Sequence, residues 1–126
     1  MRIRCLKEDL KNACLISERI SGKNATLPIL GTLLLEGEKG KFKITSTNLE
    51  IGLESVIPAQ VEEAGRVAVP ARTISGFLNS LPSEMVTLEA EKENLRVRGE
   101  RVSSLIKGQA HEDFPLFPSI KKKSGL

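Results

Sequence analysis

The sequence feature that most constrains the fold is residues 26–36, which read Thr-Leu-Pro-Ile-Leu-Gly-Thr-Leu-Leu-Leu-Glu. Pro28 has no backbone N–H to donate, so it is disfavoured inside a helix or in a central strand. Residues 26–28 are therefore predicted to be an extended lead-in. The apolar run that follows, residues 29–35, is predicted to be a buried strand and the first crossing of the core.

The length and composition favour one domain with an aliphatic core. The chain has 126 residues, 40% of them hydrophobic, which suits a single domain better than two. It contains four Phe and neither Trp nor Tyr, which disfavours binding of single-stranded nucleic acid by stacking aromatics. Its 19 basic and 16 acidic residues give a formal charge of +3, which permits contact with a polyanion without requiring it.

The two cysteines predict neither a zinc site nor a disulfide framework. Cys5 and Cys14 are too few and wrongly spaced for either, and both fall at predicted core positions. They are therefore interpreted as reduced thiols, which suggests a cytoplasmic chain. No apolar run approaches the length of a membrane span, and residues 1–20 lack the pattern of a signal peptide.

The remaining segments alternate between the periods of strands and helices. Strands are predicted at residues 1–5, 42–45, 51–57, 66–69, 86–90, 95–98 and 101–106. Helices are predicted at residues 6–20 and 71–81, and polar turns at residues 36–41 and 62–65. Periodicity ends at Gly108, so the last residues are predicted to be an exit segment.

The two parts of the chain follow the same plan. Residues 1–58 and 66–107 are each predicted to form a strand, a helix and three strands, although the two parts share little sequence. Each helix can pack one apolar stripe on a shared sheet, so the prediction is an α+β fold with two helices on antiparallel sheets. The predicted core residues are Leu10, Cys14, Leu33, Leu35, Ile44, Leu53, Phe77, Leu78, Leu88 and Val97.

Three motifs occur in a recognisable order. They are Thr26-Leu-Pro-Ile-Leu30, Val69-Pro-Ala-Arg72 and Asp113-Phe-Pro115. In this order and at these distances they resemble the first domain of the bacterial sliding clamp, the beta subunit of DNA polymerase III, over residues 1–118. Asn48 stands where that family usually carries Asp, which removes a charge but keeps a side chain that favours turns.

The resemblance implies a binding and topological function without catalysis. Members are head-to-tail homodimeric rings of three-domain chains that encircle duplex DNA and tether the replicative polymerase as processivity factors. Residues 1–118 would be the first of three domains and residues 119–126 a linker. DNA polymerase III's catalytic subunit and the clamp loader would bind through later domains, and the nucleotidyltransferase activity would belong to the holoenzyme. No cofactor, metal or membrane is implied.

The family's ring places helices against DNA, which suggests candidate contacts. Phosphate would be bound by cations and neutral polar side chains on or beside the two helices, without base readout. The candidates are Lys7, Lys11, Lys23, Asn24, Arg72 and Asn79. For each lysine taken alone, a simple solvating charge is an equally good interpretation.

The resemblance also implies an interface between subunits. In the family, the last strand of the first domain lies at a sheet edge and joins the partner's third domain. The corresponding candidates are Arg96, Arg98, Arg101, Ser103 and Leu105. Thr73 stands where relatives can carry a basic side chain, so one ionic contact is expected to be missing.

Catalytic patterns are sparse in the sequence. His111 is the single histidine, Asp9 and Asp113 are the two aspartates, and no phosphate-cradling glycine loop or Gly-x-Ser-x-Gly motif occurs. A two-metal site would need several clustered carboxylates. The alternative to a clamp segment is therefore another binding protein, namely a small stand-alone nucleic-acid or protein interaction domain of α+β fold. Continuation of the reading frame for two more domains would discriminate between them.

Overall fold

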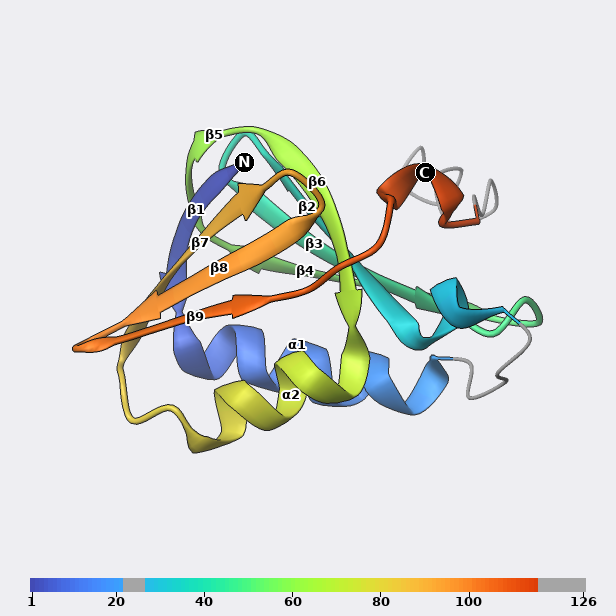
Figure 1. Cartoon of the computed structure of the whole chain (residues 1–126), viewed down its shortest axis with the longest axis horizontal. Helices are drawn as coiled ribbons and strands as arrows, with labels where there is room; N and C mark the ends of the chain where they lie inside the picture. The colour runs from blue at the N-terminus through green and yellow to red at the C-terminus, as the bar shows by residue number, and fades with distance from the viewer. Residues whose placement is uncertain (22–26, 116–126) are drawn as a thin grey trace.

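The computed structural model describes residues 1–21 and 27–115, in which antiparallel sheets stand above two helices (Figure 1). The element order is β1 (Arg2–Leu6), α1 (Lys7–Ile20), η1 (Pro28–Gly31), β2 (Thr32–Glu38), β3 (Lys41–Thr47), β4 (Gly52–Pro58), β5 (Gln60–Glu63), β6 (Gly65–Pro70), α2 (Ala71–Ser80), β7 (Met85–Glu91), β8 (Asn94–Gly99), β9 (Val102–Ile106) and η2 (His111–Asp113). The predicted α+β architecture is confirmed.

The two halves exchange their first strands. One sheet has the order β5-β1-β7-β8-β9 and the other β4-β3-β2-β6. Strand β1 thus pairs with β7 of the second half, and β6 of the second half pairs with β2 of the first. Because each sheet needs a strand from the other half, the repeat is one cooperative unit and not two small domains.

Strand β5 was not predicted, and the interpretation of residues 62–65 as a turn is wrong. Glu62 and Glu63 belong to β5, which pairs antiparallel with β1. The second half has a matching contact, because Gln109 bridges to Ala68 of β6. Strand β5 is polar and largely exposed, so it lacks the apolar alternation that identifies a half-buried strand.

The strand predicted at residues 29–35 begins later than expected. Pro28–Gly31 form a short 3₁₀ helix, and β2 begins at Thr32 and continues to Glu38. Proline's fixed φ suits the first position of a helical turn, and the Thr32 hydroxyl donates to the Ile29 carbonyl across 2.6 Å. Because β2 continues to Glu38, the turn predicted at residues 36–41 is shorter than expected and consists of Lys39 and Gly40, with Gly40 at a φ of +72°.

Most of the predicted core residues are buried. Leu33, Leu35 and Ile44 are completely inaccessible, as are Leu10, Cys14, Leu78, Leu88 and Val97. Leu53 and Phe77 are only partly buried, which corrects their prediction. Leu53 lies on β4, an edge strand with a neighbour on one side only, and Phe77 packs at the margin of the core.

Both cysteines are free and buried, Cys5 on β1 and Cys14 on α1. Burial raises the pKa of each thiol to about 12, with a further contribution from Asp9 at Cys5. Both thiols therefore stay protonated at neutral pH and serve as small apolar core residues.

The described part of the exit segment is attached to β6 of the four-stranded sheet and to β8 of the five-stranded sheet. The Gln109 N–H donates to the Ala68 carbonyl at 2.9 Å, and the Gly108 N–H donates to the Asn94 side chain at 3.1 Å. Phe114 is buried in a second apolar cluster with Ile29, Leu30, Leu34 and Ala68. The predicted linker at residues 119–126 lies outside the described residues.

Candidate nucleic-acid interface

Helices α1 and α2 lie side by side on the same side of the sheets and run in opposite directions (Figure 1). Each buries a stripe at positions i, i+3, i+4 and i+7. In α1 the stripe is Leu10, Ala13, Cys14 and Ser17, and in α2 it is Ala71, Ile74, Ser75 and Leu78. Because the stripes face the core, the opposite faces of both helices point away from the sheets.

The exposed faces of the helices carry few carboxylates, although α1 also exposes the apolar Leu15 and Ile16. On α1 the exposed residues are Glu8, Asn12, Leu15, Ile16 and Arg19. On α2 they are Arg72, Thr73, Gly76, Asn79 and Ser80, and none of the ten residues of α2 is acidic. Such a surface can approach a polyanion without strong repulsion.

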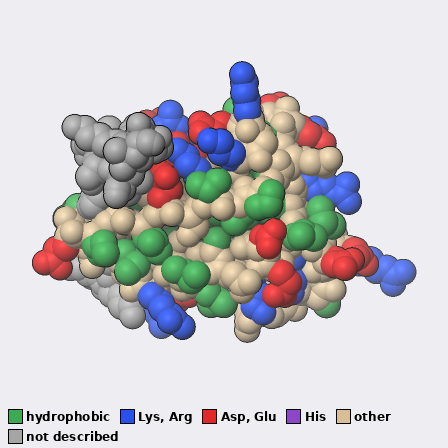
Figure 2. Space-filling model, turned by 180° about the vertical axis from the view of Figure 1, so that it is seen from behind, with side chains coloured by type: hydrophobic (Ala, Val, Ile, Leu, Met, Phe, Trp, Pro, Cys, Tyr) green, Lys and Arg blue, Asp and Glu red, His purple; other side chains and the backbone are tan. Residues whose placement is uncertain are grey.

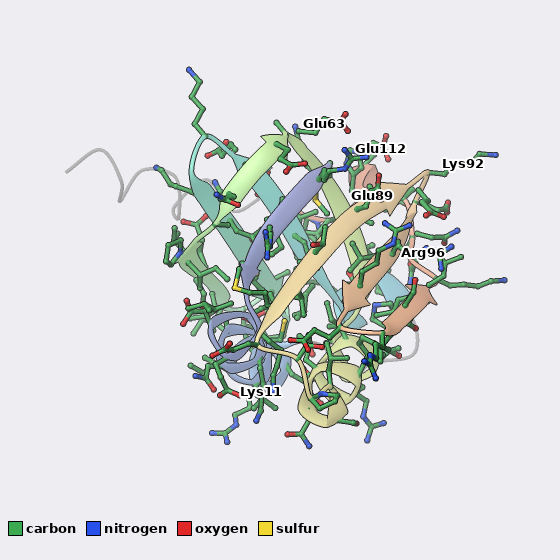
Figure 3. All side chains as sticks on the ribbon, turned by 90° about the vertical axis from the view of Figure 1, so that its left-hand side faces the viewer. Lys11, Glu63, Glu89, Lys92, Arg96 and Glu112 are labelled. Atoms are coloured by element: carbon green, nitrogen blue, oxygen red, sulfur yellow. The ribbon has the colours of Figure 1, made fainter. Side chains whose placement is uncertain are left out.

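Lys7 and Lys11 are engaged within α1. Their ammonium nitrogens lie 3.1 and 3.9 Å from the same oxygen of Glu8. The lysine side chains are 12% and 24% exposed, against 64% for Glu8, so the carboxylate lies outermost. The hydrogen bond from Lys7, followed by the charge of Lys11, lowers the pKa of Glu8. Figure 3 shows Lys11 on the side of α1 that faces away from the sheets.

The start of α1 is attached to the segment that follows α2. The Lys7 N–H donates to the Glu84 carbonyl at 2.9 Å. Lys7 and Glu8 also line an open depression whose other residues are Leu6, Pro82, Ser83, Glu84 and Glu100. The lysine-bearing end of α1 therefore lies beside the C-terminal end of α2, in acidic surroundings.

Arg72 and Arg19 lie at the opposite end of the helix pair. Arg72 is in the first turn of α2 and Arg19 in the last turn of α1, and both are exposed. Neither takes part in the ion pairs found among residues 1–21 and 27–115. Arg19 was not predicted, but its spacing from Glu8 and Asn12 places it on the same outward face.

The other candidate contacts fall in two places. Asn79 is exposed near the end of α2. Lys23 and Asn24 lie outside the described residues. The structure thus brings Lys7, Lys11, Arg72 and Asn79 to two helices on one side of the domain, with the lysines and Arg72 at different ends.

The candidate subunit interface lies at the edge of the five-stranded sheet. Strand β9 is an edge strand, and Ser103 and Leu105 are exposed on it. Arg101, at a φ of +61°, is exposed in the turn before β9.

Two arginines predicted for this interface already have partners inside the domain. Arg98 lies 2.7 Å from Glu89, and Arg96 lies 3.1 Å from Glu91. Figure 3 shows Arg96 and Glu89 on the outward side of this sheet. A partner's carboxylate would have to exchange with or add to these contacts.

The domain has a second exposed sheet edge, which is β4 of the four-stranded sheet. Leu49, Ile51 and Val56, in and beside the β3–β4 hairpin, are each about half exposed. Asn48 accepts from the backbone N–H groups of Glu50 and Ile51, which fixes a turn in which Leu49 has a φ of +79°. Figure 2, seen from behind, shows several hydrophobic side chains exposed among polar and charged ones on that face of the molecule. The edge is suited to contact with another surface.

Metal-binding geometry is not found in the described ranges. No group of three or more His, Cys, Asp or Glu residues there could hold a metal ion. His111 has Glu112 at 3.7 Å as its ion-pair partner. None of the helices in residues 1–21 and 27–115 combines the length and apolar character that a membrane crossing needs.

Comparison with known proteins identifies the family. The profile of the DNA polymerase III beta subunit, N-terminal domain, matches residues 1–118. The chain belongs to the DNA polymerase III beta subunit family. This family is the one that the three sequence motifs indicated.

Individual clamps of this family are similar to the chain in sequence and in fold. The beta sliding clamp of Vibrio cholerae is 38% identical over 75% of this chain and 26% of its own length. That of Synechocystis is 26% identical over 96% of this chain and 33% of its own length. The Helicobacter pylori beta clamp bound to a DNA ligase peptide superposes with a TM-score of 0.87 at 25% identity, over 94% of this chain and 33% of that one. The chain thus spans about a third or less of these relatives.

Proposed function

We propose that this chain is the first domain of a sliding clamp, a closed ring that encircles duplex DNA and acts as a processivity factor for DNA polymerase III. Residues 1–118 would form that domain and residues 119–126 the start of the connection to the next. The observation that carries the proposal is the helix pair. Its exposed faces hold Arg19 on α1 and, on α2, Arg72 among small and neutral side chains, on the side opposite the sheets.

The proposed DNA contact is to phosphate and independent of base sequence. Arg72 and Asn79 on α2, with Lys7 and Lys11 on α1, are the proposed contacts, and Lys23 and Asn24 are proposed with them. Scattered cations give weak, salt-sensitive binding, which suits a ring that must slide. Retention then depends on topology more than on affinity.

Two sheet edges support the ring geometry. A domain in a closed ring of different neighbours needs two separate contact surfaces. Strands β9 and β4 supply such edges on different sheets, each with exposed apolar side chains. We assign β9, with Arg96, Arg98, Arg101, Ser103 and Leu105, to the second subunit of a head-to-tail homodimer. The edge at β4 then remains for another domain.

Other partners are proposed for the later domains of the complete protein. These partners are the catalytic subunit of DNA polymerase III and the clamp loader. The Helicobacter pylori clamp was solved with a DNA ligase peptide, which supports peptide binding as the mode of recruitment. The chain itself would be non-catalytic and would act in the cytoplasm with the bacterial chromosome.

The experiment that tests the proposal measures topological retention. The complete protein is loaded onto nicked circular DNA, which is then passed over a sizing column before and after linearisation. A clamp stays on the circle and is lost from the linear product. A protein released equally from both would support the alternative, a stand-alone interaction domain.

A further inference from the structure

The proposed DNA surface has two unlike ends. At the end where α1 begins, the Lys7 and Lys11 ammonium groups lie 3.1 and 3.9 Å from one oxygen of Glu8. At the other end, Arg19 and Arg72 are exposed and form no ion pair with residues 1–21 or 27–115. The two ends therefore differ in how readily their charges can meet a phosphate.

The geometry of Glu8 is that of a competitor for phosphate. Its side chain is the most exposed member of the trio, at 64%, against 12% for Lys7 and 24% for Lys11. Because this carboxylate is close to both ammonium groups and more exposed than either lysine side chain, it competes with a phosphate oxygen for them. Because Glu8 is tethered one and three residues from the lysines, its effective concentration at them far exceeds that of a mobile ligand.

The surroundings strengthen this effect. Glu84 and Glu100 line the same depression as Lys7 and Glu8, so two further carboxylates lie near this end of the helix pair. The pKa of Glu8 is held below its ordinary value by Lys7 and then by Lys11, so the carboxylate stays charged at neutral pH. A phosphate would have to displace Glu8 while also approaching these acids.

We propose that Glu8 is an internal substitute for a DNA phosphate. It keeps Lys7 and Lys11 from contacting the duplex, so that DNA binding by this domain depends mainly on Arg72 and Arg19. This inference rests on the proposed clamp function and refines it, because Lys7 and Lys11 become held-back contacts. A ring whose contacts with DNA phosphates are weakened in this way slides along the duplex with less friction.

The test measures binding of the complete protein to a fluorescent duplex of about 30 base pairs and arbitrary sequence, by anisotropy at several salt concentrations. The substitution Glu8→Gln keeps the side-chain size but releases the lysines. We expect several-fold tighter binding and a salt dependence steeper by roughly one to two units, one for each released lysine. Lys11→Ala should cost more affinity in the Glu8→Gln background than in the wild type, and in that background it should remove much of the gain.

Glu18→Gln is the matched control, because it removes the same charge from the same helix. Glu18 forms no ion pair with the residues that the structure describes. If Glu8→Gln and Glu18→Gln increased the affinity for the duplex equally, the effect would come from the loss of one negative charge on α1 in general. That result would overturn the proposal. A loss from Lys11→Ala as large in the wild type as in the Glu8→Gln background would also overturn it.

The clamp function and the role of Glu8 can fail separately. If Arg72→Ala weakens binding while Glu8→Gln leaves it unchanged, the role of Glu8 is wrong and the DNA surface stands. If the wild-type protein shows no retention on circular DNA, both proposals fall. Denaturant unfolding of each variant identifies any loss of binding that comes from loss of folding.

Discussion

The Arg2 side chain on β1 donates to the Glu89 carboxylate on β7 at 2.8 Å, and this contact joins the first strand of one half to a strand of the other. Glu89 also accepts from Arg98 on β8 at 2.7 Å. Three strands of the five-stranded sheet are thus connected through one carboxylate. These two hydrogen bonds, with desolvation opposing them, lower the pKa of Glu89 below its ordinary 4.5.

Glu89 should make stability depend on pH in the acid range. Its pKa is lower in the folded than in the unfolded chain, so its contribution is complete above about pH 4.5 and is lost as pH falls through the folded pKa. Glu89→Gln should therefore lower the urea midpoint at pH 7, and its difference from the wild type should shrink below pH 4.5. Glu50→Gln, at an exposed position, is the control. A difference that stayed constant from pH 7 to pH 3 would contradict the role of the ion pairs.

Leu33→Ala should destabilise the fold strongly. Leu33 is completely buried in β2 between β3 and β6, so the substitution leaves a cavity that the packed sheet cannot close. The expected loss is about 2–5 kcal/mol in a denaturant titration. Leu105→Ala, with the wild-type side chain 41% exposed, is the matched control and should cost far less. A loss from Leu33→Ala below about 0.5 kcal/mol would mean that β2 is misplaced.

Periodicity predicted the elements that have one buried face. The two helices, both sheets' central strands and the duplication follow from apolar spacing, because burial of one face imposes that spacing. Strand β5 was missed because its residues Gln60–Glu63 are mostly exposed and polar. The start of β2 was misplaced because Ile29 and Leu30 are apolar for another reason, their burial against Phe114 in the second cluster.

The candidate site could be predicted only in part. Helical spacing placed Arg72 and Asn79 on an outward face, and the same spacing would have added Arg19. The engagement of Lys7 and Lys11 by Glu8 depends on side-chain conformation, which residue spacing does not determine. The surrounding carboxylates of Glu84 and Glu100 come from residues distant in sequence, so only the fold brings them close.

Phe114 should attach the exit segment to the domain. It is 6% exposed and packs with Ile29, Leu30, Leu34 and Ala68 on the outer side of the four-stranded sheet. Phe114→Ala should cost about 3 kcal/mol, the lower end for buried phenylalanine, because the cluster is small. Limited proteolysis should then cut near residues 108–115 sooner than in the wild type. Unchanged cleavage together with unchanged stability would show that the cluster contributes little.

Gly108→Ala tests the same attachment through the backbone. A Cβ at this position would collide with the carbonyl oxygens of Glu93 and Ala68, which belong to main chain that cannot move aside cheaply. The variant should therefore lose the bridge from Gln109 to Ala68 and show the same early cleavage as Phe114→Ala. Gly76→Ala is the control, since a Cβ there meets no atom within 4 Å and the change favours the helix.

Strand β9 should be the edge through which the ring closes. Leu105 is 41% exposed on this edge strand, where it pairs with Arg96 of β8 on the outward side. Leu105→Lys keeps the backbone of β9 but places a charge where an apolar contact is proposed, and charged side chains on edge strands oppose pairing with another chain. In sedimentation of the complete protein at micromolar concentration, the wild type should be dimeric and the variant should shift toward monomer. Lys107→Ala, an exposed change just beyond β9, is the control and should remain dimeric. A wild type that sediments only as a monomer would exclude ring closure by this edge, and a variant as dimeric as the wild type would move the interface away from Leu105.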